Sequence, residues 1–195
     1  MFESLAVYLV EKGGLTPNEL ELVEKVCVPK KIRKNQYLLE EGDFSDFNGF
    51  VVAGSFRQFR IGKDGEEHIM RFAIESWWVS DYTSFMTGQP SNCYIEALEN
   101  SELIWFSKEN WEGLMETIAN FKHMVDKLTA RNFEAHQNRI YSNISEPAEV
   151  RYENFVKRYP TIYNRIPLYM IASFLGLTRE TLSRVRKQMT KKKTT

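Results

Sequence analysis

The sequence has few residues that bind metals through sulfur or imidazole. Cys27 and Cys93 are the only cysteines among 195 residues, and they cannot supply the four thiolates of an iron–sulfur cluster. The three histidines, His68, His123 and His136, are scattered and form no His-x-His pair. This excludes a cupin-type metal site and leaves haem ligation by a single histidine with little support. We therefore expect no metal and no cofactor.

Long apolar runs and an export signal are also missing. No window approaches the roughly 18 consecutive apolar residues of a membrane-spanning helix, and the first residues, Met1–Leu5, lack the basic start of a signal peptide. In such a chain the two cysteines are expected to be free thiols rather than a disulfide. We therefore expect a cytoplasmic protein. Because 43% of its residues are hydrophobic and 13% aromatic, it can bury a core and is not disordered.

The net charge of zero conceals an uneven distribution. Residues 151–195 contain eleven Lys and Arg against two Glu, a balance of +9, and residues 1–150 therefore carry −9. A basic end on an otherwise acidic chain is typical of a sensor joined to a nucleic-acid-binding segment. A solvated lysine tail would explain Lys191–Lys193 but not the basic residues between Lys157 and Lys187, which alternate with apolar ones.

Short β-type runs separated by turn residues occupy the middle of the chain. The predicted strands are 37–39, 49–52, 56–61, 68–72 and 103–106. Gly42, Gly54 and Gly65 lie in the intervening turns, and Asp64-Gly65 is a hairpin signal. Many short strands at regular spacing predict an antiparallel, jelly-roll-like β-roll. We therefore expect an α+β fold with this domain over residues 1–117.

A long helix is predicted over residues 118–144, which contain neither Gly nor Pro. Phe121, Val125 and Leu128 recur at helical spacing. This apolar side is either a dimer seam, which packs against a second chain, or the side of an internal strut, which packs within its own chain. Asn132 and Arg131 interrupt it, so no heptad coiled coil is predicted.

The C-terminal residues 145–195 contain a helix-turn-helix pattern. Pro167 can start one helix, and Gly176 permits the left-handed backbone that ends it. Thr178 is then the N-cap of a second helix, which Leu182 and Val185 would bury. This short turn is the geometry that places the second helix in a DNA major groove. A helical hairpin with a charged face is the plainer alternative.

The second helix of this pattern has a polar outward side suited to DNA. Arg can bond guanine bidentately, and Glu can accept a hydrogen bond from cytosine. Hydroxyl groups and further cations can bind phosphates. The predicted base readers are Arg179, Glu180, Ser183 and Arg184, and the predicted backbone contacts are Thr178, Thr181, Arg186 and Lys187.

The segment from Arg179 to Arg184 resembles the recognition helix of the Crp–Fnr family of bacterial transcription regulators. The resemblance covers nearly the whole chain, with a cyclic-nucleotide-binding-type β-roll, a dimerisation helix and a helix-turn-helix. It implies that Glu180 and Arg184 read the half-site and that a homodimer binds a palindromic operator in double-stranded DNA. It also makes RNA polymerase a candidate partner.

The chain departs from this family at the nucleotide pocket. Family members that bind cyclic nucleotides carry Gly-Glu, followed about a dozen residues later by Arg-Ser or Arg-Thr. Ser80-Asp81 and Ser91-Asn92 stand at these places, so no Arg is left for the phosphate. We expect no dependence on cyclic AMP. A pocket for another, unidentified effector would be lined by Trp78, Asp81, Tyr82, Ser91, Asn92 and Tyr94. Its aromatic members are alternatively β-roll core.

The chain also departs from the family after the second helix. Family members continue into a β-hairpin wing, whereas Lys191–Lys193 follow here, so we expect a truncated wing and a mobile lysine tail that contacts phosphates. A small-molecule sensor whose helix-turn-helix binds protein is the rival function. An enzyme has the least support, since no nucleophile–base or metal constellation is visible.

Overall fold

The computed structural model describes the backbone of residues 1–192 and the side chains up to Met189. Its elements are α1 (Phe2–Gly13), α2 (Pro17–Val26), β1 (Val28–Ile32), β2 (Tyr37–Leu39), β3 (Phe47–Ala53), β4 (Phe56–Ile61), β5 (Glu67–Ala73), β6 (Trp78–Val79), α3 (Tyr82–Thr87), β7 (Tyr94–Ala97), β8 (Ser101–Ser107), α4 (Lys108–Thr117), α5 (Ala119–Ser145), α6 (Ala148–Arg158), α7 (Leu168–Leu175) and α8 (Arg179–Lys192). The chain forms two compact units. The N-terminal unit contains Met1–Arg60 and Arg71–Ala130, and the C-terminal unit contains Ile61–Met70 and the chain from Arg131 onward.

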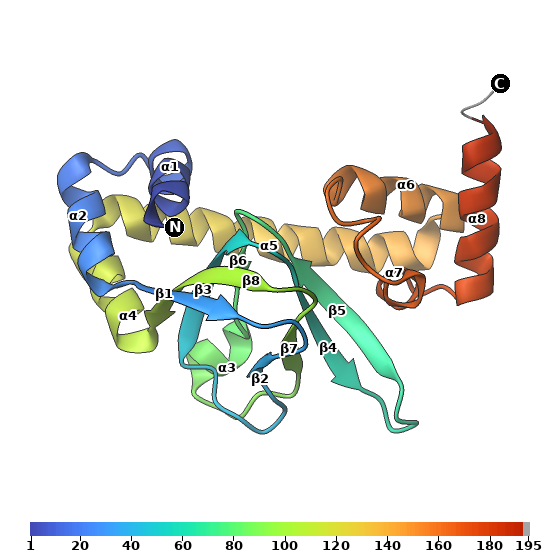
Figure 1. Ribbon diagram of the computed structural model, residues 1–195, viewed down its shortest axis with the longest axis horizontal. Helices are drawn as coiled ribbons and strands as arrows, with labels where there is room; N and C mark the ends of the chain where they lie inside the picture. Colours follow the sequence, from blue (N-terminus) through green and yellow to red (C-terminus); the bar gives the residue numbers. More distant parts are fainter. Residues whose placement is uncertain (193–195) are drawn as a thin grey trace. The chain divides into compact units, whose positions relative to one another are not determined.

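Two four-stranded sheets form the predicted β-roll (Figure 1). Their strand orders are β1-β8-β3-β6 and β2-β7-β4-β5, and the strand pairs with a defined register are antiparallel. Alternate residues of each strand point inward, because successive side chains of a strand face opposite sides. Val51 and Leu103 from the first sheet and Phe56 and Ile95 from the second meet in one buried cluster. The predicted antiparallel β-roll is confirmed, with β1, β6 and β7 as further strands.

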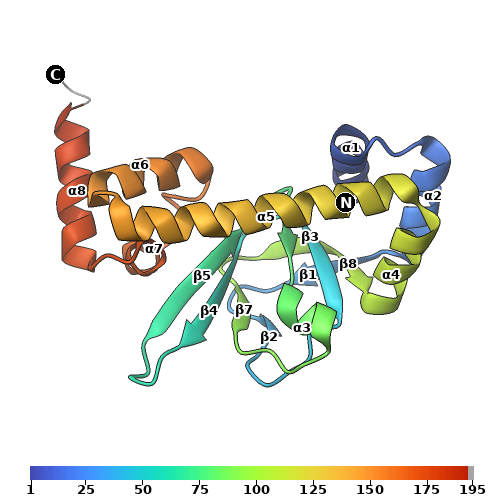
Figure 2. The ribbon, with the colours of Figure 1, turned by 180° about the vertical axis from the view of Figure 1, so that it is seen from behind.

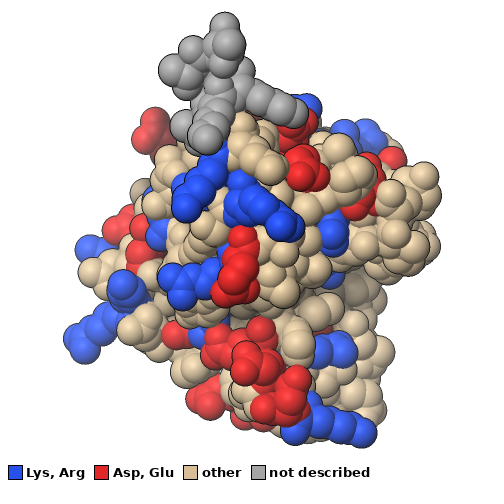
Figure 3. Space-filling model, turned by 90° about the vertical axis from the view of Figure 1, so that its right-hand side faces the viewer, with Lys and Arg blue, Asp and Glu red and all other residues tan. Residues whose placement is uncertain are grey.

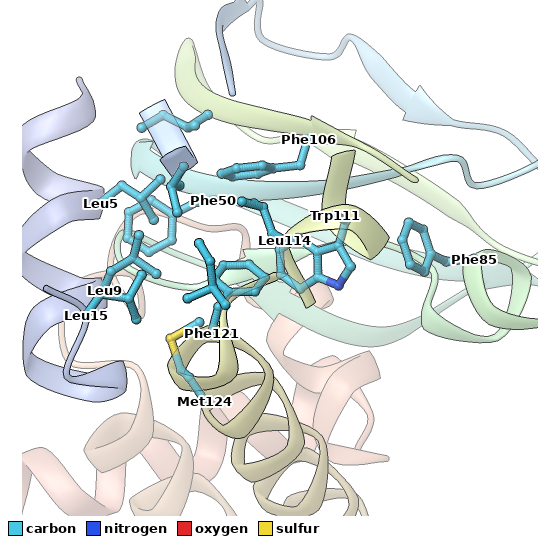
Figure 4. Close-up of a cluster of buried hydrophobic side chains, with 13 residues drawn as sticks. Leu5, Leu9, Leu15, Phe50, Phe85, Phe106, Trp111, Leu114, Phe121 and Met124 are labelled. Carbon is cyan, nitrogen blue, oxygen red and sulfur yellow. The ribbon is translucent and has the colours of Figure 1, made fainter. Parts of the chain in front are cut away.

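A second cluster packs helices onto the β-roll. Leu5 and Leu9 of α1 and Trp111 of α4 bury their side chains together with Phe121 and Met124 of α5 (Figure 4). Figure 2 shows α1 and α2 beside the first turns of α5. Phe121 and Met124 are 0% and 1% exposed, so this part of the helix is an internal strut. Val125 and Leu128 on the same side are only partly buried against this cluster, so the dimer seam stays a prediction for this apolar side.

The later part of α5 carries an exposed apolar stripe. Phe133, Ile140, Tyr141 and Ile144 are 67%, 53%, 68% and 81% exposed. With 3.6 residues per turn, these four positions fall within about a third of the helix circumference. We call them the α5 stripe. Apolar side chains this exposed, gathered on one face, are typical of a surface that another chain covers.

The C-terminal unit has its own small core. Phe155, Tyr159 and Phe174 pack with ring centroids 4.9 to 5.8 Å apart. Leu182 and Val185 on α8 are 0% and 1% exposed, as the sequence predicts for the buried side of this helix. This core orients α8 against α6 and α7. Within the part of the chain that the structure describes, no helix is both long and apolar enough to cross a membrane.

Candidate nucleic-acid interface

The helix-turn-helix forms as the sequence predicts. Gly176 ends α7 with φ of 63°, in the left-handed region that favours glycine. The amide of Leu177 then bonds the carbonyl of Ala172 at 2.9 Å, which closes the end of the helix. The amide of Thr181 donates to Thr178 Oγ1 at 3.1 Å, so Thr178 caps the start of α8. The turn between the helices is therefore held by local bonds.

Residues from other segments of the C-terminal unit form hydrogen bonds with α7. Arg151 Nη1 of α6 donates to the carbonyl of Leu175 at 2.7 Å, at the C-terminal end of α7. Ser173 Oγ accepts from the amide of Ile69 at 2.9 Å and donates to the carbonyl of Glu67 at 3.1 Å. Nothing in the sequence signals these contacts, because both use backbone atoms that any residue supplies. They hold the scaffold against which α8 packs.

The outward side of α8 forms a shallow hollow. It is lined by Arg179, Glu180, Ser183, Arg184, Lys187 and Gln188. Figure 3 shows Lys and Arg side chains gathered around an acidic side chain on the face where α8 lies. Glu180 and Arg184 are four residues apart, yet among the described residues neither makes an ion pair or hydrogen bond. Their charged groups are thus available to a ligand. We call these six residues the α8 face.

The four predicted base readers all belong to the α8 face. The four residues predicted to contact the DNA backbone do not all lie on it. Lys187 lies on the face. Thr178 Oγ1 and Thr181 Oγ1 are 3.0 Å apart and bond each other next to it. Arg186 is half-buried on another side of the helix. Burial raises the pKa of the Tyr152 phenol, and the charge of Arg186 acts in the opposite direction, which places Arg186 near α6.

The sequence prediction missed Gln188 and the full length of α8. Gln188 lines the hollow although the base readers were assigned only to the first turns. Its signal in the sequence was its spacing of four residues from Arg184. The helix continues to Lys192, into the lysines that were expected to form a tail, because Lys, Gln and Met are good helix formers. The predicted phosphate contacts of Lys191–Lys193 lie outside the side chains that the structure describes.

Two of the predicted effector-pocket residues meet inside the β-roll. Ser91 Oγ donates to Asp81 Oδ2 at 2.8 Å, and both side chains are buried. Cys93 Sγ lies 3.5 Å from the same carboxylate oxygen, and Gln58 Nε2 donates to Cys93 Sγ at 2.9 Å. The amides of Thr83 and Ser84 also bond Asp81 Oδ1. This buried polar cluster satisfies its own hydrogen-bonding groups.

The other predicted pocket residues lie elsewhere. Trp78 packs among aromatic rings of the helix-facing core, with its centroid 4.9 Å from that of Trp111. Tyr94 stacks on Phe59 at 5.1 Å. Tyr82 is 53% exposed, and Asn92 is also on the surface. The structure therefore brings Asp81 and Ser91 together but not the full set of six.

No guanidinium takes part in the described hydrogen bonds of the buried polar cluster. Arg57 forms a buried ion pair with Glu96, with Nη2 and Oε2 2.6 Å apart. Arg71 Nη2 donates to the carbonyl of Trp78 at 2.9 Å. Ser91, predicted to stand in the place of a phosphate-binding arginine, bonds Asp81 through its hydroxyl.

The reactivity of Cys93 tests whether solvent and reagents reach the buried polar cluster. Burial raises the pKa of its thiol, while hydrogen bonds from Gln58 and Ser91 act against the shift. Because the thiolate is the nucleophile, the folded protein should alkylate at Cys93 at least ~10-fold more slowly near neutral pH than the same chain in urea. Iodoacetamide labelling followed by peptide mass spectrometry measures this rate. Equal rates in the folded and unfolded chains would contradict a closed cluster.

Comparison with known proteins agrees with this geometry. Residues 29–118 match the model of the cyclic nucleotide-binding domain, and residues 171–194 match that of bacterial regulatory proteins of the crp family. The fumarate and nitrate reduction regulatory protein of Vibrio cholerae is 25% identical over 88% of this chain and 72% of its own length. The anaerobic regulatory protein of Haemophilus influenzae is 24% identical over 88% and 70%.

Solved structures share the fold. FixK2 from Bradyrhizobium japonicum superposes with a TM-score of 0.74 at 18% identity, covering 86% of both chains. The catabolite activator protein of Thermus thermophilus gives a TM-score of 0.59 at 20% identity, covering 92% of this chain and 85% of its own.

Proposed function

The chain belongs to the Crp–Fnr family of transcription regulators, and from that membership we propose that it binds a palindromic DNA operator as a homodimer. The observation that carries this proposal is the α8 face, whose charged side chains have no partner among the described residues. An exposed helix of this kind fits a major groove about 12 Å wide, where Arg and Glu distinguish base pairs. The +9 balance of residues 151–195 attracts the phosphates.

The α5 stripe supports the homodimer. Its apolar side chains would be covered by the same stripe of a second copy, because a two-fold interface uses one surface twice. Phe133, Ile140 and Ile144 follow each other seven and four residues apart, the spacing at which two parallel helices interlock. Such a dimer places its two α8 helices about one DNA turn apart, which requires inverted half-sites.

We propose three regions for this function, with boundaries of 1–117 for the β-roll, 118–144 for the dimerisation helix and 145–195 for the DNA-binding domain. The relatives are regulators rather than enzymes, which supports a regulatory and non-enzymatic role. Among the described residues there is no group of three or more His, Cys, Asp or Glu that could hold a metal. We propose that the protein acts in the cytoplasm, with RNA polymerase as a partner.

Cyclic AMP is not the effector in this proposal, because the place of the phosphate-binding arginine holds Ser91, already bonded to Asp81. We expect no change in the melting temperature at millimolar cyclic AMP. A ligand at 100 times its dissociation constant would stabilise the fold by ~2.7 kcal/mol, which is readily seen in a thermal melt. A saturable rise in melting temperature would contradict this part of the proposal.

Selection from randomised double-stranded DNA tests the main proposal. The full chain should enrich an inverted repeat whose half-sites are centred about one helical turn apart. Enrichment of no sequence, together with a melting shift from a small molecule, would favour a sensor whose helix-turn-helix binds protein. Enrichment of a single, unrepeated site would leave DNA binding standing and contradict the dimer.

A further inference from the structure

The α8 face extends one turn beyond the residues that define the family's recognition helix. Lys187 and Gln188 line the same hollow as Glu180 and Arg184. The side chain of Gln188 is exposed, and among the described residues it makes no hydrogen bond. A carboxamide of this kind has both a donor and an acceptor to offer a ligand.

The spacing along α8 places Gln188 in line with Arg184. The two residues are four positions apart, so they lie on the same side of the helix, about 6 Å apart along its axis. Gln188 is about 12 Å from Glu180 by the same rise of 1.5 Å per residue. Base pairs are stacked every ~3.4 Å, so a side chain displaced by this much meets a different base pair.

The chemistry of a glutamine amide selects one base. Its oxygen accepts from the N6 amino group of adenine while its nitrogen donates to N7, a bidentate pair that other base pairs do not offer in the major groove. Lysine beside it behaves differently, since a flexible ammonium binds phosphate as a point charge. A neutral amide also releases no counterion, so its contribution is independent of salt.

We infer that Gln188 is an additional base-reading residue, which binds an adenine outside the base pairs read by Glu180 and Arg184. This inference rests on the proposed function and deepens it by lengthening each half-site. Each half-site should therefore carry an A·T pair at one of its two ends, which is its outer position relative to the base pairs that Glu180 and Arg184 read. Lys187, in contrast, supports binding to any sequence.

Selection from randomised DNA with four proteins tests the inference. The wild-type chain should enrich adenine at an outer position of the half-site, and Gln188→Ala should lose about tenfold of that preference while the inner positions stay unchanged. Gln188→Glu should replace the outer adenine by cytosine, because a carboxylate accepts from cytosine N4. Lys187→Ala is the control, and should weaken all sequences alike.

The possible outcomes distinguish a failure of this inference from a failure of the proposed function. If the motif of Gln188→Ala equals that of the wild type, or if its binding falls equally for every sequence, the role of Gln188 is overturned and the proposed function stands. If the wild-type chain enriches no motif, the proposed function falls and this inference with it. Thermal melts of the variants confirm that an exposed substitution leaves the fold intact.

Discussion

A chain carrying Ile140→Asp and Ile144→Asp is expected to be a monomer at micromolar concentration and to bind its operator at least ~100-fold more weakly. Burying one isoleucine contributes roughly 1.5–3 kcal/mol, and a two-fold interface contains each substitution twice. An aspartate in an apolar seam adds the cost of burying an unpaired charge. Analytical ultracentrifugation measures the first effect, and a mobility-shift titration the second.

A matched control separates the seam from a general effect of negative charge on α5. Asn138 is exposed outside the α5 stripe, about 60° around the helix from Tyr141, its nearest member, so Asn138→Asp should leave both the dimer and operator binding unchanged. If the double variant stayed dimeric, the α5 stripe would not be the interface, and another surface would have to bring two α8 helices together.

The second large effect is expected at the base readers. Arg184→Ala should lose about 10- to 100-fold in affinity for the selected operator and much less for unrelated DNA, because one bidentate base contact contributes ~1–3 kcal/mol of discrimination. Glu180→Ala should relax the preference at a different base pair of each half-site. Competition titrations with operator and mixed-sequence DNA measure the ratio directly.

Removing a positive charge also weakens binding to DNA of any sequence. A control variant that loses one positive charge elsewhere in the chain is therefore needed. Arg131 is exposed on α5, away from the α8 face, and Arg131→Ala should leave the ratio of specific to non-specific binding intact. Lys187→Ala should weaken operator and mixed DNA together and lower the salt slope by about one. Our division of roles would be wrong if Arg184→Ala and Lys187→Ala had the same effect on both kinds of DNA.

The sequence predicts the helix-turn-helix well because its determinants are local. Gly176 and Thr178 mark the turn through backbone conformation and capping, and both act within a few residues. The polar side of α8 follows from helical spacing alone. The residues proposed as base readers follow from the sequence, and the structure places all of them on one face.

Contacts between distant segments could not be predicted in the same way. Phe121 and Met124 have the spacing of a seam, and only the position of α1 and α4 reveals that these side chains are buried within the chain. The bond from Ser91 to Asp81 likewise depends on how β7 and α3 are brought together in the roll. The family resemblance assigns both residues to the same predicted pocket. Their direct hydrogen bond becomes visible only in the folded structure.

Native mass spectrometry of the protein bound to a selected duplex tests the central claim most directly. On a duplex with one inverted repeat, we predict a complex of two chains per DNA, and only weak binding to a duplex in which one half-site is scrambled. Two recognition helices from one dimer explain both results. One chain per duplex, with equal affinity for the intact and half-scrambled sites, would contradict a dimer that reads both half-sites through α8.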